Sequence, residues 1–165
     1  MEAYRGVLEA FPGKKVVVRT LDAGADKPLP FLTDSTEANP ALGVRAYRTA
    51  RRDPEVLEHQ LQALAKAEAV TSAKVWVMAP MISTADEAKA FTDKARSYGL
   101  TIAGMMIEVP SAAIMADKLF EHAPGDLFIG MGMPMDKGLP EIVQAELYGF
   151  FRLVVARIGE MVQHY

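Results

Sequence analysis

The stretch Val16-Val17-Val18-Arg19-Thr20-Leu21-Asp22-Ala23-Gly24-Ala25-Asp26-Lys27 decides the fold class of this chain. Three consecutive β-branched valines predict a strand, which ends at Arg19 and is followed at once by an acidic turn that contains a glycine. In parallel α/β proteins, the residues just past the carboxyl end of a strand line the ligand site. We therefore expect Arg19, Asp22 and Lys27 to lie at such a site.

The remainder of the chain alternates predicted strands with predicted helices. Strands are expected at 16–19, 74–79, 102–108 and 127–130, and helices at 2–11, 41–52, 54–69, 85–98 and 111–122. Pro54 favours the start of one helix, and Ser83 or Thr84 is expected to cap another. This order predicts an α/β fold with a parallel sheet and right-handed crossovers. No repeat or linker stands out, so residues 1–165 are expected to form a single domain.

A long C-terminal helix is expected from about Pro140 to Tyr165, because apolar residues recur there at helical spacing. We expect the uncovered inner face of the sheet to carry six apolar residues: Val16, Val18, Val75, Val77, Met105 and Ile107. Leaving such a face in water costs roughly 25 cal/mol per Å². Either the C-terminal helix covers it, or two chains bring their faces together. We favour association, which predicts a homo-oligomer.

Composition excludes several classes of function. The 165 residues contain no cysteine, so disulfides, thiol catalysis and Cys-ligated metals are excluded. The net charge is −3 and no basic patch is evident, which argues against nucleic-acid binding. No apolar run is long enough to span a membrane, and no signal peptide is evident at the start. We therefore expect a soluble, cytoplasmic protein that does not bind membranes.

A second cationic segment follows the first strand, at Glu37-Ala38-Asn39-Pro40-Ala41-Leu42-Gly43-Val44-Arg45-Ala46-Tyr47-Arg48. Two arginine sites, Arg19 and Arg45, indicate a ligand with phosphate or carboxylate groups, because guanidinium presents planar, bidentate donors to such oxyanions. The alternative is that both are surface or salt-bridging arginines. Arg48, Arg51 and Arg52 are expected to form a solvated helix face.

Glu108 is a candidate metal ligand. It ends the strand predicted at 102–108, where a carboxylate can bind a hard cation such as Mg²⁺ together with phosphate oxygens. The residues leave two other roles open: capping the following helix, or pairing with Arg19. We assign no catalytic residue from the sequence.

Four strings occur in this order: VRTLDAGADKPLPFL (residues 18–32), EANPALGVRAYR (37–48), VMAPMIST (77–84) and GMMIEVPSAA (104–113). Together they resemble the C-terminal, phosphoenolpyruvate-binding domain of Enzyme I, the phosphoenolpyruvate–protein phosphotransferase of the bacterial sugar phosphotransferase system. In the second string, Ala38 stands where the family often has a second acidic residue. The resemblance covers about residues 4–130 and implies the first half of a (β/α)₈ (TIM) barrel. It implies that Arg19 and Arg45 contact phosphoenolpyruvate or a similar anion, that Asp22 and Lys27 order the loop around it, and that Glu108 binds Mg²⁺.

The chain departs from the family pattern after Leu127. Gly132 and Met133 stand where the family has an Asn-Asp pair, whose aspartate is the second Mg²⁺ ligand, and the later segment with the catalytic cysteine is missing. Trp76 replaces what is often an arginine. The resemblance thus implies a domain for phosphoryl transfer from phosphoenolpyruvate to a protein histidine, incomplete and inactive alone. The alternative is a non-catalytic, truncated or engineered half-barrel that self-associates.

Overall fold

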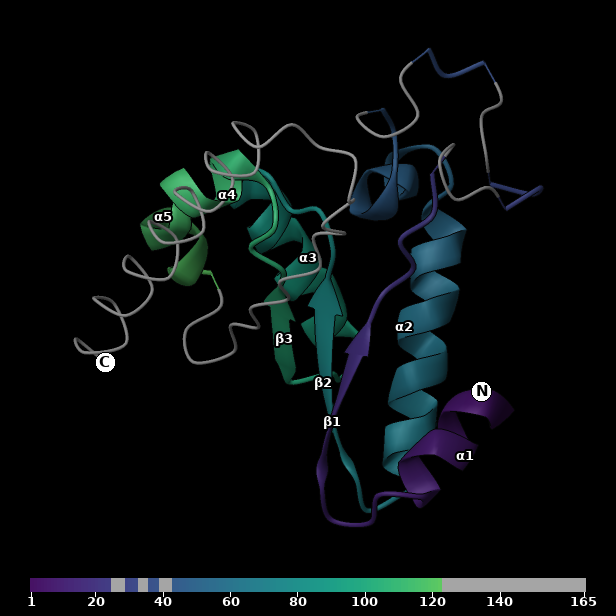
Figure 1. Cartoon of the computed structure of the whole chain (residues 1–165). Coiled ribbons are helices and arrows are strands. Elements are labelled where there is room, and N and C mark those ends of the chain that lie inside the picture. The colour runs from purple at the N-terminus through teal and green to yellow at the C-terminus, as the bar shows by residue number, and fades with distance from the viewer. Residues whose placement is uncertain (25–28, 33–35, 39–42, 123–165) are drawn as a thin grey trace, which may run out of the picture.

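The computed structural model describes residues 1–24, 29–32, 36–38 and 43–122, which form an α/β unit (Figure 1). Its elements in chain order are α1 (Glu2–Glu9), β1 (Lys15–Arg19), the 3₁₀ helix η1 (Ala46–Arg51), α2 (Pro54–Ala69), β2 (Lys74–Ala79), α3 (Ala85–Ser97), β3 (Ile102–Met105), α4 (Pro110–Ile114) and α5 (Ala116–Phe120). The expected α/β class is confirmed. The strand expected at 127–130 and the helix expected at 140–165 lie outside the described residues.

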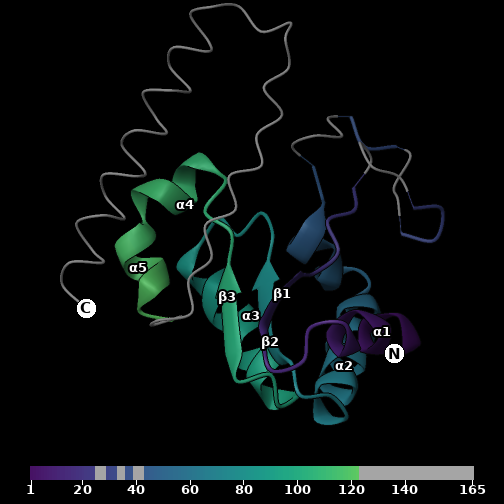
Figure 2. The same ribbon diagram turned by 60° about the horizontal axis from the view of Figure 1, so that its bottom comes forward.

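The strands in the described ranges form one parallel sheet in the order β1-β2-β3 (Figure 2). Val17 lies opposite Trp76 and Trp76 opposite Ile102, while Arg19 lies opposite Met78. All strands run in the same direction, so the segments that follow them meet at one edge of the sheet. The loops that carry the candidate ligand-binding residues therefore begin side by side.

One face of the sheet carries the hydrophobic core. Val75, Val77 and Ala79 of β2 and Ala103 and Met105 of β3 are buried together with apolar residues of the helices, among them Leu8, Leu61, Leu64 and Phe91. Val16 and Val18 pack against the same cluster. The expectation that this set forms the uncovered inner face is therefore wrong: these are the residues that α1, α2 and α3 cover.

The opposite face of the sheet carries the alternate residues of each strand, since side chains alternate along a strand. Val17 is 48% exposed there, and Trp76 and Met78 are half-buried. The Nζ atom of Lys15 lies 4.3 Å from the centroid of the Trp76 ring, a cation–π contact. Self-association was predicted for the other face, which the helices cover; whether two chains associate at all stays a prediction.

The sequence correctly predicts where α2 and α3 begin. Helix α2 begins at Pro54 as predicted, and Thr84 caps α3 by accepting a hydrogen bond from the Glu87 N–H through Oγ1 at 3.2 Å. Gly99 follows α3 with a φ of +91°, the left-handed conformation that commonly ends a helix. In these described ranges, no helix combines the length and the apolar character needed to cross a bilayer.

Three predicted elements differ from the structure. Residues 46–51 form a 3₁₀ helix, and an α-helix cannot run into it because Arg45 is extended and Ala46 has a φ of +51°. The helix expected at 111–122 is divided into α4 and α5 at Met115. Strand β3 ends at Met105 rather than at Glu108, although the Met106 N–H still donates to Ala79 O at 2.9 Å.

The two faces of the sheet can be compared with one pair of methionines on neighbouring strands. Met105→Ala empties a fully buried position against the helices and should lower the free energy of unfolding by about 2–5 kcal/mol. Met78→Ala on the opposite face should cost at most about 1 kcal/mol. Urea unfolding followed by circular dichroism measures both. Equal losses would contradict the assignment of the core face.

Candidate functional site

The loop after β1 is held in place by helices α1 and α2. The Leu21 N–H donates to Gln60 Oε1 at 2.9 Å, and Gln60 Nε2 donates to the Tyr4 hydroxyl at 2.8 Å. The Thr20 N–H continues the sheet by donating to Met78 O at 2.9 Å. These hydrogen bonds determine where the chain leaves the sheet and therefore where Asp22 lies.

Asp22 joins the two predicted ligand-binding arginines. Its side chain is only 5% exposed; Oδ2 lies 3.0 Å from Arg19 Nη1, and Oδ1 lies 3.0 Å from Arg45 Nη2 and accepts a hydrogen bond from Arg45 Nε at 3.2 Å. One carboxylate thus holds two guanidinium groups whose residues are 26 positions apart in the sequence. Three of the four predicted binding residues converge, and Lys27 lies outside the described residues.

Arg45 is placed by the segment that leads into η1. The Ala46 N–H donates to Ala23 O at 2.9 Å, which attaches the start of η1 to the Asp22 loop. The Val44 N–H donates to Glu37 Oε2 at 3.3 Å. A Cβ at Gly43 would lie 2.1 Å from this Glu37 oxygen, so a larger residue at this position would displace the Glu37 carboxylate.

The two arginines differ in exposure. Arg45 is only 8% exposed and gives two nitrogen donors to Asp22, so it is a buried, ion-paired residue. Arg19 is 42% exposed and, among the residues that the structure describes, contacts Asp22 through Nη1. Its Nε and Nη2 donors thus remain for an oxyanion at the edge of the sheet. Arg19, Arg45 and Asp22 together carry a formal net charge of +1.

Glu108 lies three residues beyond the end of β3. Its Oε1 accepts a hydrogen bond from the Met81 N–H at 2.7 Å. In the described structure it neither caps α4, whose N-cap Val109 has no side-chain hydrogen bond, nor pairs with Arg19, which binds Asp22. Glu108 therefore lies at the carboxyl end of the sheet, beside the segment that follows β2.

The described residues fit Mg²⁺ only in part. They contain no group of three or more His, Cys, Asp or Glu side chains that could hold a metal ion. Mg²⁺ is commonly bound by one or two carboxylates together with substrate phosphates and water. Glu108 is therefore suited to be one ligand in such a shared site.

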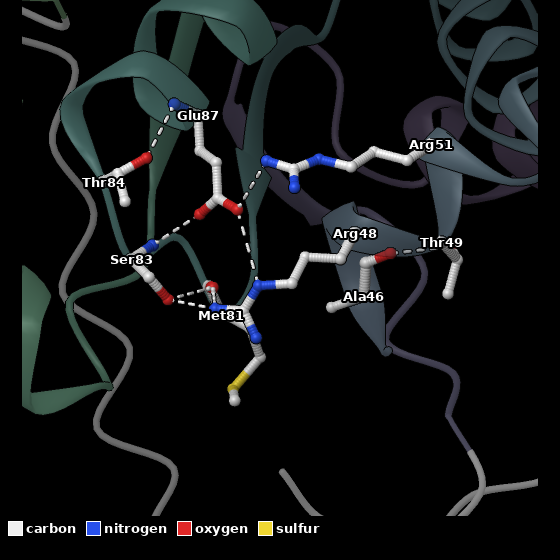
Figure 3. A network of polar contacts seen from close by, with 8 residues as sticks. All are labelled: Ala46, Arg48, Thr49, Arg51, Met81, Ser83, Thr84 and Glu87. Carbon is white, nitrogen blue, oxygen red and sulfur yellow. Dashed lines mark hydrogen bonds and ion pairs between the residues drawn. The ribbon is translucent and has the colours of Figure 1, made fainter. Parts of the chain in front are cut away.

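A second polar cluster joins η1 to the start of α3 (Figure 3). Glu87 is 6% exposed, and its Oε1 lies 3.4 Å from Arg48 Nε and 3.5 Å from Arg51 Nη2. Its Oε2 accepts a hydrogen bond from the Ser83 N–H at 2.9 Å. The prediction of a solvated face is therefore wrong for Arg48, whose partly buried side chain also donates to Ser83 Oγ.

Burial, and then the nearby Glu87 carboxylate, raise the pKa of the Tyr47 phenol. Tyr47 is therefore neutral near neutral pH, and its ring packs edge-on against Phe91 with the centroids 5.9 Å apart. The cluster around Glu87 thus borders the hydrophobic core.

The family described as "PEP-utilising enzyme, PEP-binding domain" matches residues 1–132. The chain belongs to this family. A phosphoenolpyruvate-protein phosphotransferase of Streptomyces coelicolor is 52% identical over 131 residues, which cover 79% of this chain and 23% of that protein. Proteins of the same name from Staphylococcus carnosus and Haloferax volcanii are 44% and 40% identical and cover 70% and 73% of this chain. The chain spans only 22% to 24% of the length of these curated relatives.

The match to the PEP-binding domain confirms the resemblance proposed for residues 4–130. Arg19, Asp22, Arg45 and Glu108 all lie within the matched range. The sequence did not predict that Glu87 pairs with Arg48 and Arg51. The Thr84-Ala85-Asp86-Glu87 pattern, a capping box preceded by a serine, signals only that Glu87 lies in the first turn of a helix.

Asp22→Asn should destabilise the fold by about 3 kcal/mol, because it removes the negative charge that pairs with the buried Arg45 guanidinium. The matched control is Asp53→Asn, which breaks an exposed pair with Arg52 and should cost at most about 1 kcal/mol. Thermal and urea unfolding measure both. Equal stability of the two variants would show that Asp22 does not hold the arginine pair together.

Proposed function

We propose that this chain binds phosphoenolpyruvate at the carboxyl end of its parallel strands, with Arg19 and Arg45 holding the phosphate and carboxylate groups. The observation that carries the proposal is the buried Asp22 carboxylate, which holds two guanidinium groups where β1 ends. Parallel α/β proteins bind their ligands at this edge of the sheet. The family match and the printed name of the relatives support phosphoenolpyruvate as the anion.

Phosphoenolpyruvate suits the two arginines chemically. It is a small, rigid molecule with a phosphate and a carboxylate, and guanidinium binds both groups through paired N–H donors. Because Asp22 already orients both arginines, less side-chain freedom is lost when the ligand binds. The exposed donors of Arg19 are the first that an entering anion meets.

We propose further that the α/β unit is the first part of a (β/α)₈ barrel. A complete barrel needs about 250 residues, more than the 165 of this chain. In this arrangement the face with Val17, Trp76 and Met78 is the barrel interior. Association with a second copy through this face is the proposed way of removing it from water.

Mg²⁺ is the proposed metal, with Glu108 as one ligand. When bound, it would neutralise charge on the phosphate. The chain's own contribution is to hold the Glu108 carboxylate through the hydrogen bond from the Met81 N–H.

The relatives are named for phosphoryl transfer from phosphoenolpyruvate to a protein, and a histidine is the proposed acceptor. We propose that this chain supplies binding without turnover when it is alone. Gly132 and Met133 replace the family's Asn-Asp pair, and the chain has no cysteine to serve as the acid. Losing a metal ligand and an acid removes both charge stabilisation and proton transfer.

Binding is tested by calorimetric titration of the full chain with phosphoenolpyruvate. Arg45→Ala should weaken binding at least about tenfold, because a hydrogen bond to a charged group contributes about 1.5–3 kcal/mol. Arg19→Lys changes a half-exposed residue and should leave the fold intact, so weaker binding by this variant reflects the site and not a loss of stability. Arg5→Ala on α1, where the arginine pairs only with exposed glutamates among the described residues, is the control and should bind like the wild type. Identical titrations for all four proteins would refute the site.

Turnover is tested with phosphoenolpyruvate, Mg²⁺ and a histidine-containing acceptor protein. We expect pyruvate release no faster than in Arg19→Ala, because the chain lacks the family's second metal ligand and its acid. A coupled pyruvate assay and phosphohistidine detection measure the two products. Wild-type turnover above the Arg19→Ala background would overturn the proposal that the chain is inactive alone.

A further inference from the structure

We propose that Glu87 is a positioning residue that sets the placement of Arg45 and Glu108 relative to each other. The inference rests on the proposed function, because it concerns the same anion site. Glu87 is remote in sequence from both residues and has no assigned role in ligand binding. Its buried carboxylate gathers contacts from two segments that lead directly to them (Figure 3).

The first set of contacts connects Glu87 to Arg45 through η1. Arg48 and Arg51 of η1 both reach Glu87 Oε1, at 3.4 and 3.5 Å. Within η1, Thr49 Oγ1 donates to Ala46 O at 2.7 Å, and Ala46 follows Arg45 directly. Anchoring η1 at Glu87 therefore limits where the backbone of Arg45 can lie.

The second set of contacts connects Glu87 to Glu108 through Met81. Glu87 Oε2 holds the Ser83 N–H at 2.9 Å, and Ser83 Oγ donates to Met81 O at 3.2 Å. Arg48 Nη2 donates to the same carbonyl at 3.5 Å. The N–H of Met81 in turn donates to Glu108 Oε1 at 2.7 Å.

Met81 needs these contacts because of its backbone conformation. Its φ is +58°, a left-handed conformation that is unfavourable for a residue with a side chain. Without the hydrogen bonds to its carbonyl, the residue would relax and its N–H would turn away from Glu108. The carbonyl and N–H of this one residue thus join the Glu87 cluster to the proposed metal ligand.

Neutralising Glu87 should disturb both the η1 side of the site, which leads to Arg45, and the Met81 side, which leads to Glu108, because Arg48 contacts both Glu87 and the Met81 carbonyl. A glutamine at this position retains an oxygen for the Ser83 N–H but loses the charge that attracts Arg48 and Arg51. The two arginines would then repel each other on η1. We expect the positions of Arg45 and Glu108 to become uncoupled, although neither residue has been changed.

The test is calorimetric titration of Glu87→Gln with phosphoenolpyruvate, with and without Mg²⁺, in the full chain. We expect affinity to fall about tenfold, within the range by which packed networks influence a site that they do not touch. The gain in affinity on adding Mg²⁺ should also shrink. Thermal unfolding of the same samples confirms that the folded protein is being titrated.

Two control variants separate positioning from helix stability and from overall charge. Thr84→Ala removes the cap of the same helix, which lowers its stability, and leaves the carboxylate in place. Asp86→Asn removes an exposed carboxylate from the same helical turn. Both variants should bind phosphoenolpyruvate as the wild type does.

Weaker binding in Glu87→Gln alone supports the inference. Unchanged binding in Glu87→Gln overturns it, and so does an equal loss in Thr84→Ala, which would assign the effect to helix stability. A wild-type chain that does not bind phosphoenolpyruvate overturns the proposed function instead, and the inference with it.

Discussion

Two guanidinium groups at the end of one strand repel each other, and the buried carboxylate of Asp22 allows them to lie together. Burying a cation costs free energy unless it is paired, and the Asp22 carboxylate pairs with Arg45, whose side chain is only 8% exposed. The hydrogen bonds from Leu21 to Gln60 and from Ala46 to Ala23 hold the two segments that carry Asp22 and Arg45 beside each other. The site therefore depends on one ion-paired triad.

The rigid support for this triad comes from the face of the sheet that packs against the helices. Helices α2 and α3 bury one face of β2 and β3, and the residues of that core are almost completely removed from water. Loops that extend from well-packed strands can hold polar groups in defined positions. The core thus supports the proposed binding site by restricting the motion of the strands from which its loops extend.

Local sequence signals predicted the elements whose ends depend on their own residues, such as α2 at Pro54 and α3 at Thr84. The position of Arg19 and Asp22 at the carboxyl end of β1 was also predictable, because the strand ends at Arg19. The pairing of Asp22 with Arg45, 23 positions away, depends on the folded loop. The core face was not predictable, since Val16, Val17 and Val18 are equally apolar on both sides of β1. The pairing of Arg48 with Glu87 joins residues 39 positions apart, so no local pattern indicates it.

Because η1 is a 3₁₀ helix, two of its arginines extend from the same side. A 3₁₀ helix has about 3.0 residues per turn, so residues three apart lie directly above one another along its axis. Arg48 and Arg51 have this spacing and reach one carboxylate oxygen. In an α-helix, with about 3.6 residues per turn, the same two side chains would diverge by roughly 60° around the axis. The tighter winding of this single segment thus brings Arg48 and Arg51 into line along one side of η1, where both reach the same glutamate oxygen.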